Sequence, residues 1–150
     1  MRILIQRVKE ASVSIDNKVY SKIGNGLLIL LGIEEADDSS DIKWLVEKIL
    51  KLRVFDDEKG VMNLSVTDVL GELLIVSQFT LYASTKKGAR PSYIRAARPG
   101  KAIPLYEEFL NMVSQKMGQK PASGVFGAEM QIGLINDGPV SIWIDSKQKE

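Results

Sequence analysis

The sequence contains no cysteine and no histidine among its 150 residues. Without cysteine there can be no disulfide, no thiolate nucleophile and no zinc site built on thiolates. Without histidine the protein lacks the most common general base, the Ser-His-Asp triad and every histidine-ligated metal site. Any catalysis must therefore rest on carboxylates, hydroxyls, lysines, the peptide backbone or a group of the substrate.

Long hydrophobic runs and a strong net charge are also missing. Hydrophobic residues make up 45% of the chain, but no run approaches the ~20 apolar residues that a membrane helix needs. The first residues alternate polar and apolar side chains and lack the basic region and apolar core of a signal peptide. The formal net charge of +1 gives no global indication of a nucleic-acid partner. We expect a single cytoplasmic domain over residues 1–150, without a membrane partner.

No cofactor is expected either. Three adjacent carboxylates, Asp56, Asp57 and Glu58, could bind Mg²⁺ or Ca²⁺. They lack the alternating ligands of a calcium loop and lie between two short apolar runs, so we interpret them as the solvated turn of a hairpin. The sequence thus predicts no metal, because histidine and cysteine ligands are absent as well.

Hydrophobic periodicity predicts a mixed α/β fold. Strand signals occur at residues 3–15, 19–20, 27–33, 53–55, 61–64 and 72–83, and on both sides of a break at residues 136–139. One helix is expected over residues 40–52, after an Asp-Asp-Ser-Ser start signal, and a second over residues 104–117. We expect a bent β-sheet or small barrel plus a second sheet layer, covered on one side by the two helices.

Polar residues interrupt two of the predicted strands. Arg7 lies within the first strand, where it could extend into solvent from an edge, the interpretation we prefer from the residues alone, or reach carbonyls with its forked donors. Ser77, Gln78 and Thr80 interrupt the apolar run at 72–83. Because a buried hydroxyl or amide without a partner costs ~1–3 kcal/mol, these groups either hydrogen-bond inside the core or line a pocket. Both interpretations remain open.

A basic segment follows the second of these strands. Residues 84–101 contain six cations and no acid, together with prolines and glycines that predict a long irregular loop. The cations are Lys86, Lys87, Arg90, Arg95, Arg98 and Lys101. A phosphate-rich partner and a merely solvated loop are both compatible with this composition.

The break at residues 136–139 reads Asn-Asp-Gly-Pro and predicts a tight reversal between two strands. Pro139 has no N–H and a fixed φ, while Gly138 can adopt angles closed to other residues. The pair is therefore a stiff corner with carbonyls available for a partner. The alternative is an ordinary turn without a function.

Several segments, taken in order along the chain, share the pattern of one family. They are Ile5–Val8 with Ala11–Val13, Gly26–Leu28, Met62–Leu64, Val76–Leu81, Gly88–Ser92, Phe126–Gln131 and Asn136–Val140. Together they resemble the D-aminoacyl-tRNA deacylases, over residues 1 to about 145. The Ser-Gln-Phe-Thr and Asn-x-Gly-Pro-Val motifs, ~60 residues apart, are specific as a pair, although each alone is weak. Ser141 departs from the threonine that is common in the family.

The resemblance implies a homodimeric hydrolase. Its substrate would be the ester that joins a D-amino acid, or glycine, to the terminal adenosine of tRNA. The Gly138-Pro139 bond would be cis and would enter the active site of the other subunit. There its carbonyls would hold the α-amino group of the substrate, and an L side chain would collide with the corner.

The resemblance also assigns roles to residues. The predicted strand with Ser77, Gln78, Phe79 and Thr80 would form the floor of the catalytic pocket, with Gln78 and the Phe79 N–H near the scissile carbonyl and the adenine. We expect attack by water, assisted by the ribose hydroxyl, ahead of a Thr80 nucleophile that no histidine can activate. Substrate binding and chiral selection are assigned to Gly138, Pro139, Met130, Phe126 and Arg7. The six cations of residues 84–101 would bind tRNA.

Two hypotheses from other classes remain open. One is a non-catalytic RNA-binding module that uses the basic loop. The other is a dimerisation domain in which the Gly-Pro corner merely locks two subunits. The polar interruption of the strand at residues 72–83 favours the hydrolase.

Overall fold

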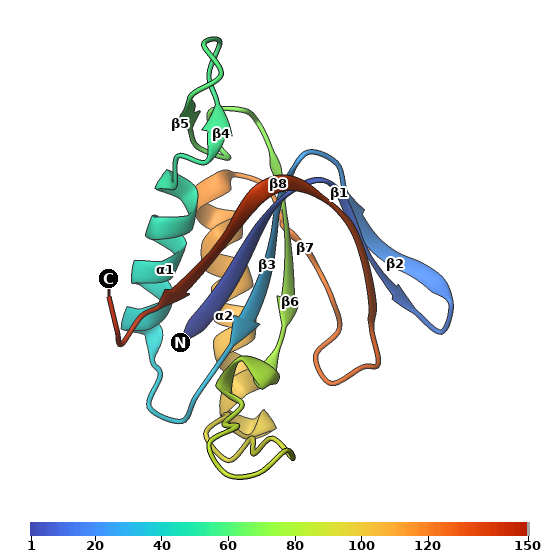
Figure 1. Ribbon diagram of the computed structural model, residues 1–150, viewed down its shortest axis with the longest axis vertical. Helices are drawn as coiled ribbons and strands as arrows, with labels where there is room; N and C mark the ends of the chain where they lie inside the picture. The colour runs from blue at the N-terminus through green and yellow to red at the C-terminus, as the bar shows by residue number, and fades with distance from the viewer. Residues whose placement is uncertain (150) are drawn as a thin grey trace.

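The computed structural model describes residues 1–149, so Glu150 of the predicted domain 1–150 lies outside the described residues. In chain order the elements are β1 (Arg2–Ile15), β2 (Lys18–Ile23), β3 (Gly26–Gly32), α1 (Ser39–Lys51), β4 (Phe55–Asp56), β5 (Met62–Leu64), β6 (Glu72–Ser77), the 3₁₀ turn η1 (Phe79–Tyr82), α2 (Pro99–Met117), β7 (Ala122–Ser123) and β8 (Gln131–Asp145). The predicted mixed α/β fold is confirmed (Figure 1).

The long strand β1 organises the main sheet. Along one edge its first half pairs antiparallel with β3 and its second half with β2. Along the other edge it pairs with β8 over almost its whole length. Strands β6 and β7 extend the sheet in parallel from β3, and β4 and β5 form a separate hairpin. The predicted second sheet is this hairpin.

The main sheet bends into a nearly closed barrel. Ser21 of β2 donates a hydrogen bond to the Ser123 carbonyl of β7, with an oxygen–oxygen distance of 2.7 Å, and so joins the two outer strands. One cluster of buried side chains, including Val13, Leu28 and Val76, fills the barrel. A larger cluster lies between the sheet and the two helices, which cover one side of it (Figure 1).

The first helix begins close to where the sequence predicts. Asp38 caps α1, because its side chain accepts from the Ser40 N–H while the Asp41 side chain accepts from the Asp38 N–H. The predicted start of the second helix at Pro104 is wrong. Helix α2 begins at Pro99. Pro104 is tolerated inside it because Pro104 and Gly100 are both exposed, so the Gly100 carbonyl, which Pro104 leaves without its helical partner, can bond water.

Two further boundaries differ from the prediction. Strand β6 ends at Ser77, and residues 79–82, which were expected to continue it, turn into η1. The expected reversal at residues 136–139 is a bulge within the single strand β8. Both halves of β8 run antiparallel to β1, with Asn136 opposite Val8 and Ser141 opposite Gln6, so residues 137–140 bulge out beside Arg7. The run of apolar residues on either side of the bulge belongs to one strand because β1 is long enough to pair with both.

Candidate functional site

A cavity of about 280 Å³ opens where β3 and β6 end. Its lining joins segments that are far apart in the sequence, namely the ends of these strands, the start of α2 and residues 126–132. The residues on its wall are Leu31, Ile33, Val76, Ser77, Gln78, Phe79, Ala97, Ala102, Phe126, Gly127, Ala128, Met130 and Ile132. Five of the nine residues proposed for catalysis or substrate binding therefore lie on one cavity.

The end of β6 fixes the polar side of this cavity. The Gln78 N–H donates to the Leu31 carbonyl at 2.8 Å, which holds the chain against β3 just before η1 begins. The Gln78 side-chain amide donates to the Thr80 hydroxyl oxygen. Because η1 starts at Phe79, the N–H groups of Phe79 and Thr80 have no partner within the turn. They are available to an oxygen of a ligand.

The opposite wall comes from residues 124–130. Gly127 adopts a φ of +78°, which favours glycine. Phe126 lies against the ring of Tyr106 at 5.9 Å between centroids, and the Tyr106 hydroxyl donates to the Ile75 carbonyl at 2.8 Å. Burial raises the pKa of Tyr106 to about 12, so the hydroxyl remains a neutral donor. The Met130 sulfur lies so close to Gly124 that a side chain there would displace it.

The basic segment does not present all six cations in one loop. The loop is closed by paired backbone bonds between Ser84 and Ser92, and Lys86, Lys87 and Arg90 are exposed beyond that closure.

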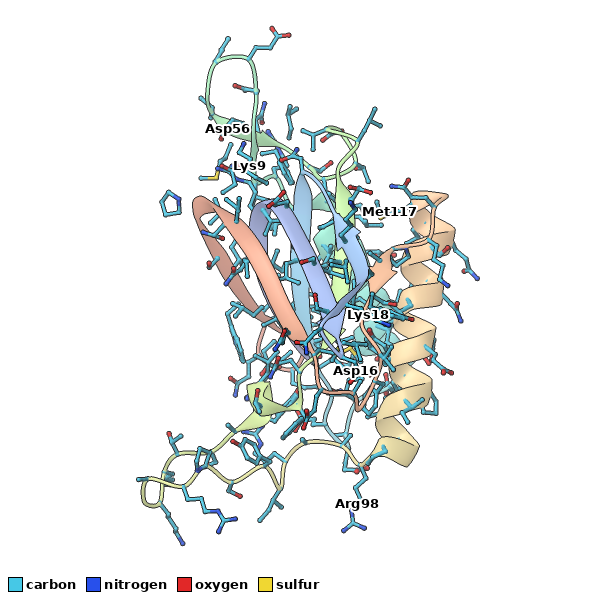
Figure 2. All side chains as sticks on the ribbon, turned by 90° about the vertical axis from the view of Figure 1, so that its right-hand side faces the viewer. Lys9, Asp16, Lys18, Asp56, Arg98 and Met117 are labelled. Atoms are coloured by element: carbon cyan, nitrogen blue, oxygen red, sulfur yellow. The ribbon has the colours of Figure 1, made fainter. Side chains whose placement is uncertain are left out.

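Three of the six cations lie at the root of this loop. Arg95 turns back to Glu34 at 3.5 Å. Arg98 is the residue just before α2, its side chain makes no capping hydrogen bond, and it points away from the sheet (Figure 2). Lys101 lies in the first turn of that helix. The sequence analysis assigned all six cations to one loop because the composition of residues 84–101 does not show where the loop ends and the helix begins.

The bulge of β8 carries the Gly-Pro corner. The Gly138-Pro139 bond is cis, as expected, and both residues are exposed. The preferred interpretation of Arg7 as a solvent-facing arginine is wrong, since its side chain is only 8% exposed. Arg7 donates to the Asp137 carbonyl at 3.0 Å and to the Val54 carbonyl at 2.5 Å. It also pairs with the Asp137 carboxylate at 3.2 Å and so ties the corner to the body of the protein.

The corner and the cavity lie at opposite ends of the sheet within one chain. The corner bulges beside Arg7, which pairs with Leu27 near the start of β3. The cavity lies beside Ser77, which pairs with Leu31 near the end of β3. Four residues along a strand span about 13 Å. In Figure 1 the middle of β8 accordingly crosses the top of the sheet, while η1 lies below its lower end.

Sequence reasoning missed the contribution of small and aromatic residues around the cavity. Ala97 and Ala102, at the root of the basic loop and in α2, line it and leave it open. Tyr93 packs edge-on against Phe79, with ring centroids 5.1 Å apart. Tyr93 was visible as an aromatic within a basic loop, but its partner could not be identified without the fold. The alanines carry no sequence signal of a site.

Within residues 1–149, no group of three acidic side chains is arranged to hold a metal ion. None of the helices in the same range is long and apolar enough to cross a membrane.

Comparisons with known proteins identify the family. The family model described as D-Tyr-tRNA(Tyr) deacylase matches residues 4–145. A D-aminoacyl-tRNA deacylase of Porphyromonas gingivalis is 61% identical, and one of Flavobacterium psychrophilum is 57% identical, each over the full length of both chains. The chain belongs to the D-Tyr-tRNA(Tyr) deacylase family. The resemblance inferred from the Ser-Gln-Phe-Thr and Gly-Pro motifs is thereby confirmed.

Two solved structures share the fold of this family. One, titled c-Myc DNA Unwinding Element Binding Protein, is 40% identical, has a TM-score of 0.90, and covers 97% of this chain and 98% of its own. The other is titled as a probable eukaryotic D-amino acid tRNA deacylase. It has a TM-score of 0.81 at 16% identity, covers 95% of this chain and 97% of its own, and shows the likeness of fold alone.

Proposed function

We propose that this protein hydrolyses the ester between a D-amino acid, or glycine, and the terminal adenosine of tRNA. The observation that carries the proposal is the cavity at the end of β6. There the Ser-Gln-Phe motif of a deacylase family faces the Phe126–Met130 segment across about 280 Å³. This space suits an amino acid attached to a ribose.

The chemistry follows from what the cavity offers. No histidine is available as a base, and the Thr80 hydroxyl already accepts from the Gln78 amide. In this mechanism the Phe79 N–H and the Gln78 amide bind the scissile carbonyl oxygen and stabilise the negative charge that forms on it. One such donor is typically worth ~10²–10³ in rate. A water molecule, assisted by the neighbouring ribose hydroxyl, attacks an ester that is already activated.

Chiral selection requires a second copy of the chain. The corner of one chain lies too far from its own cavity to line it, yet Gly138 and Pro139 are exposed and held outward by Arg7. In a two-fold symmetric dimer each corner enters the cavity of the other subunit. Its carbonyls hold the α-amino group, and an L side chain must either collide with the corner or give up those hydrogen bonds.

The exposed cations of the basic loop hold the tRNA. Lys86, Lys87 and Arg90 extend from the loop that begins directly after η1, so phosphates bound there place the terminal adenosine near the cavity. Phe79, 56% exposed and packed against Tyr93, offers an aromatic surface to the adenine.

Incubation with D-tyrosyl-tRNA and L-tyrosyl-tRNA tests the activity. Loss of the D ester at a rate far above that of buffer, with the L ester left intact, is expected. Equal rates of hydrolysis of the D and L esters would show that the protein does not select by chirality. Binding of tRNA without hydrolysis of either ester would favour a nucleic-acid-binding module instead, and loss of neither ester together with no tRNA binding would favour a dimerisation domain.

A further inference from the structure

The 3₁₀ turn η1 carries the groups that the proposed reaction needs most, and it is buried at its end, where Tyr82 is fully buried, but exposed at its start. It spans four residues, Phe79–Tyr82, and its own hydrogen bonds are short-range. Such turns have poorer hydrogen-bond geometry than α-helices. Phe79 at its start is 56% exposed. The position of the Phe79 N–H therefore depends both on the bond from the Gln78 N–H to the Leu31 carbonyl before the turn and on what fixes the other end of the turn.

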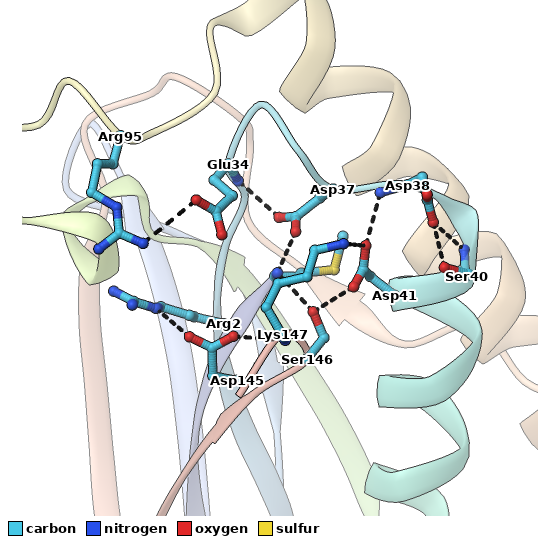
Figure 3. A network of polar contacts seen from close by, with 11 residues as sticks. Arg2, Glu34, Asp37, Asp38, Ser40, Asp41, Arg95, Asp145, Ser146 and Lys147 are labelled. Atoms are coloured by element: carbon cyan, nitrogen blue, oxygen red, sulfur yellow. Dashed lines mark hydrogen bonds and ion pairs between the residues drawn. The ribbon is translucent and has the colours of Figure 1, made fainter. Parts of the chain in front are cut away.

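Arg2 reaches that end. Its Nη1 donates to the Leu81 carbonyl at 3.1 Å, and its guanidinium carbon lies 4.4 Å from the centre of the Tyr82 ring. Its Nε donates to the Asp145 carboxylate at 2.7 Å, a contact drawn in Figure 3. The side chain is only 15% exposed, so these contacts are largely shielded from water. One planar guanidinium thus connects η1 to the end of β8.

The strand register explains why a residue at the start of β1 can do this. Arg2 pairs with Gly32 of β3 on one side and with Asp145 of β8 on the other. Gly32 is where η1 rests on the sheet, because a Cβ built there would lie 3.0 Å from the Leu81 Cβ and 3.1 Å from the Gln78 carbonyl oxygen. The turn is therefore supported by glycine backbone beneath it and by Arg2 beside it.

The far side of Arg2 is well anchored. Asp145 precedes Ser146, whose hydroxyl bonds both the Met1 amino group at 2.8 Å and the Asp41 carboxylate at 2.6 Å. The Lys147 side chain donates to Asp41 as well, at 2.7 Å. Figure 3 shows how this network gathers the starts of β1 and α1 around the end of β8. Arg2 thus connects η1 to a part of the structure that several hydrogen bonds hold in place.

We propose that Arg2 is a positioning residue of the deacylase site, which holds η1, and with it the Phe79 N–H and the Thr80 hydroxyl, through its bond to the Leu81 carbonyl. The inference rests on the function proposed above. It assigns no direct contact with the substrate to Arg2. Small displacements of a donor are costly in catalysis, since a misplacement of about 1 Å can lower a rate ~10²-fold.

The variant Arg2→Lys tests this proposal, because lysine keeps a positive charge for Asp145 but lacks the fork that bonds Asp145 and Leu81 together. We expect kcat for D-tyrosyl-tRNA to fall about tenfold or more, with KM within about twofold of the wild type. Amide hydrogen exchange should accelerate at Leu81 and Ala83, whose N–H groups bond inside the turn, but not at Gln78.

A matched control is Arg53→Lys. Arg53 also donates from Nε to a backbone carbonyl, that of Asn63, but on the β4–β5 hairpin away from the cavity. We expect wild-type kcat. If Arg2→Lys and Arg53→Lys had the same kcat, or if exchange at Leu81 and Ala83 were unchanged, the proposal would be overturned.

A second variant separates positioning from general support. Asp145→Asn removes the ion pair but keeps an oxygen that can accept from the Arg2 Nε, and it leaves the bond from Arg2 to Leu81, so kcat is expected to stay within about threefold of the wild type while stability falls. A tenfold loss of kcat in Asp145→Asn with unchanged hydrogen exchange at Leu81 and Ala83 would mean that the end of β8 affects catalysis without η1, and would overturn the proposal. If the wild type itself hydrolysed no D ester, the proposed function would fail, whereas hydrogen exchange would still decide whether Arg2 holds η1.

Discussion

Thr80, in η1 beside the cavity that Ser77 lines, has a hydroxyl that could be mistaken for a nucleophile. Its oxygen accepts from the Gln78 amide, and the protein contains no histidine to remove its proton. A serine or threonine without an adjacent base is a weak nucleophile. In the mechanism that we propose, the hydroxyl orients the Gln78 amide, and the backbone and the substrate carry the reaction.

Replacement of Thr80 by valine tests this assignment, because valine keeps the shape and removes the hydroxyl. We expect kcat for D-tyrosyl-tRNA to fall by no more than about tenfold, a loss smaller than that of one oxyanion donor. Single-turnover rates of the wild type and of Thr80→Val give the comparison. Activity reduced to that of buffer would instead make Thr80 the nucleophile.

Arg7 shows at the same scale why residue patterns alone mislead. An arginine in an alternating strand is usually an edge residue with its charge in water. Here the Asp137 carbonyl, brought close by the bulge of β8, and the Val54 carbonyl, brought close by the turn into β4, surround it. Neither segment is near Arg7 in the sequence, so its burial could not be predicted.

At the scale of elements, the basic loop is expected to bind tRNA mainly through phosphates. The triple variant Lys86→Ala, Lys87→Ala, Arg90→Ala should weaken tRNA binding and flatten its salt dependence by about 0.7–0.9 in slope for each phosphate that the loop no longer neutralises. Binding measured at several salt concentrations provides the slope. Lys116→Ala, at the far end of α2 and paired with Glu47, is the control and should leave the slope unchanged. A triple variant with the wild-type slope would make the loop a solvated surface.

The strands and helices themselves were largely predictable from the sequence. The apolar run of β3 is buried on both faces of the sheet, and Asp38 caps α1 where the start signal indicated. What could not be predicted was how elements join. Pro104 looked like a helix start because proline favours that position, and the Gly-Pro break looked like a reversal because turns favour those residues. Only the pairing of both halves of β8 with β1 shows that the chain does not reverse.

The network that joins both ends of the chain makes whole-molecule stability depend on pH. Burial alone would raise the pKa of Asp41 and of Asp145. Hydrogen bonds from Lys147 and Ser146 to Asp41, and from Arg2 and the Lys147 N–H to Asp145, outweigh it and hold both pKa values below their ordinary range. A lowered folded-state pKa contributes stability that is present above the unfolded pKa, about 3.9 for Asp, and lost as the pH falls through the folded value. The contribution of Asp37 to the pH dependence of stability has the opposite sign, because burial raises its pKa.

Urea denaturation at a series of pH values tests this account. The free energy of unfolding should fall as the pH drops below about 4. Asp145→Asn should be less stable than the wild type at neutral pH, by roughly 1.5–3 kcal/mol, and should lose less on acidification. Glu58→Gln, at the exposed tip of the hairpin, should follow the wild-type curve. Parallel curves for the wild type and Asp145→Asn would show that this carboxylate does not carry the acid sensitivity.

The claim that one active site is built from two chains is tested most directly by mixing two inactive variants. Gln78→Ala damages the cavity. Gly138→Val adds a side chain at the exposed corner, where a Cβ would crowd the movable Asn136 amide of its own chain and otherwise make only an ordinary contact with the Val140 nitrogen. After the subunits exchange in an equal mixture, half of the dimers are mixed, and each of these has one site with both defects and one intact site. The account predicts that D-tyrosyl-tRNA hydrolysis returns to about a quarter of the wild-type rate. No recovery in a mixture shown to contain mixed dimers would contradict it, because cavity and corner would then serve the same chain.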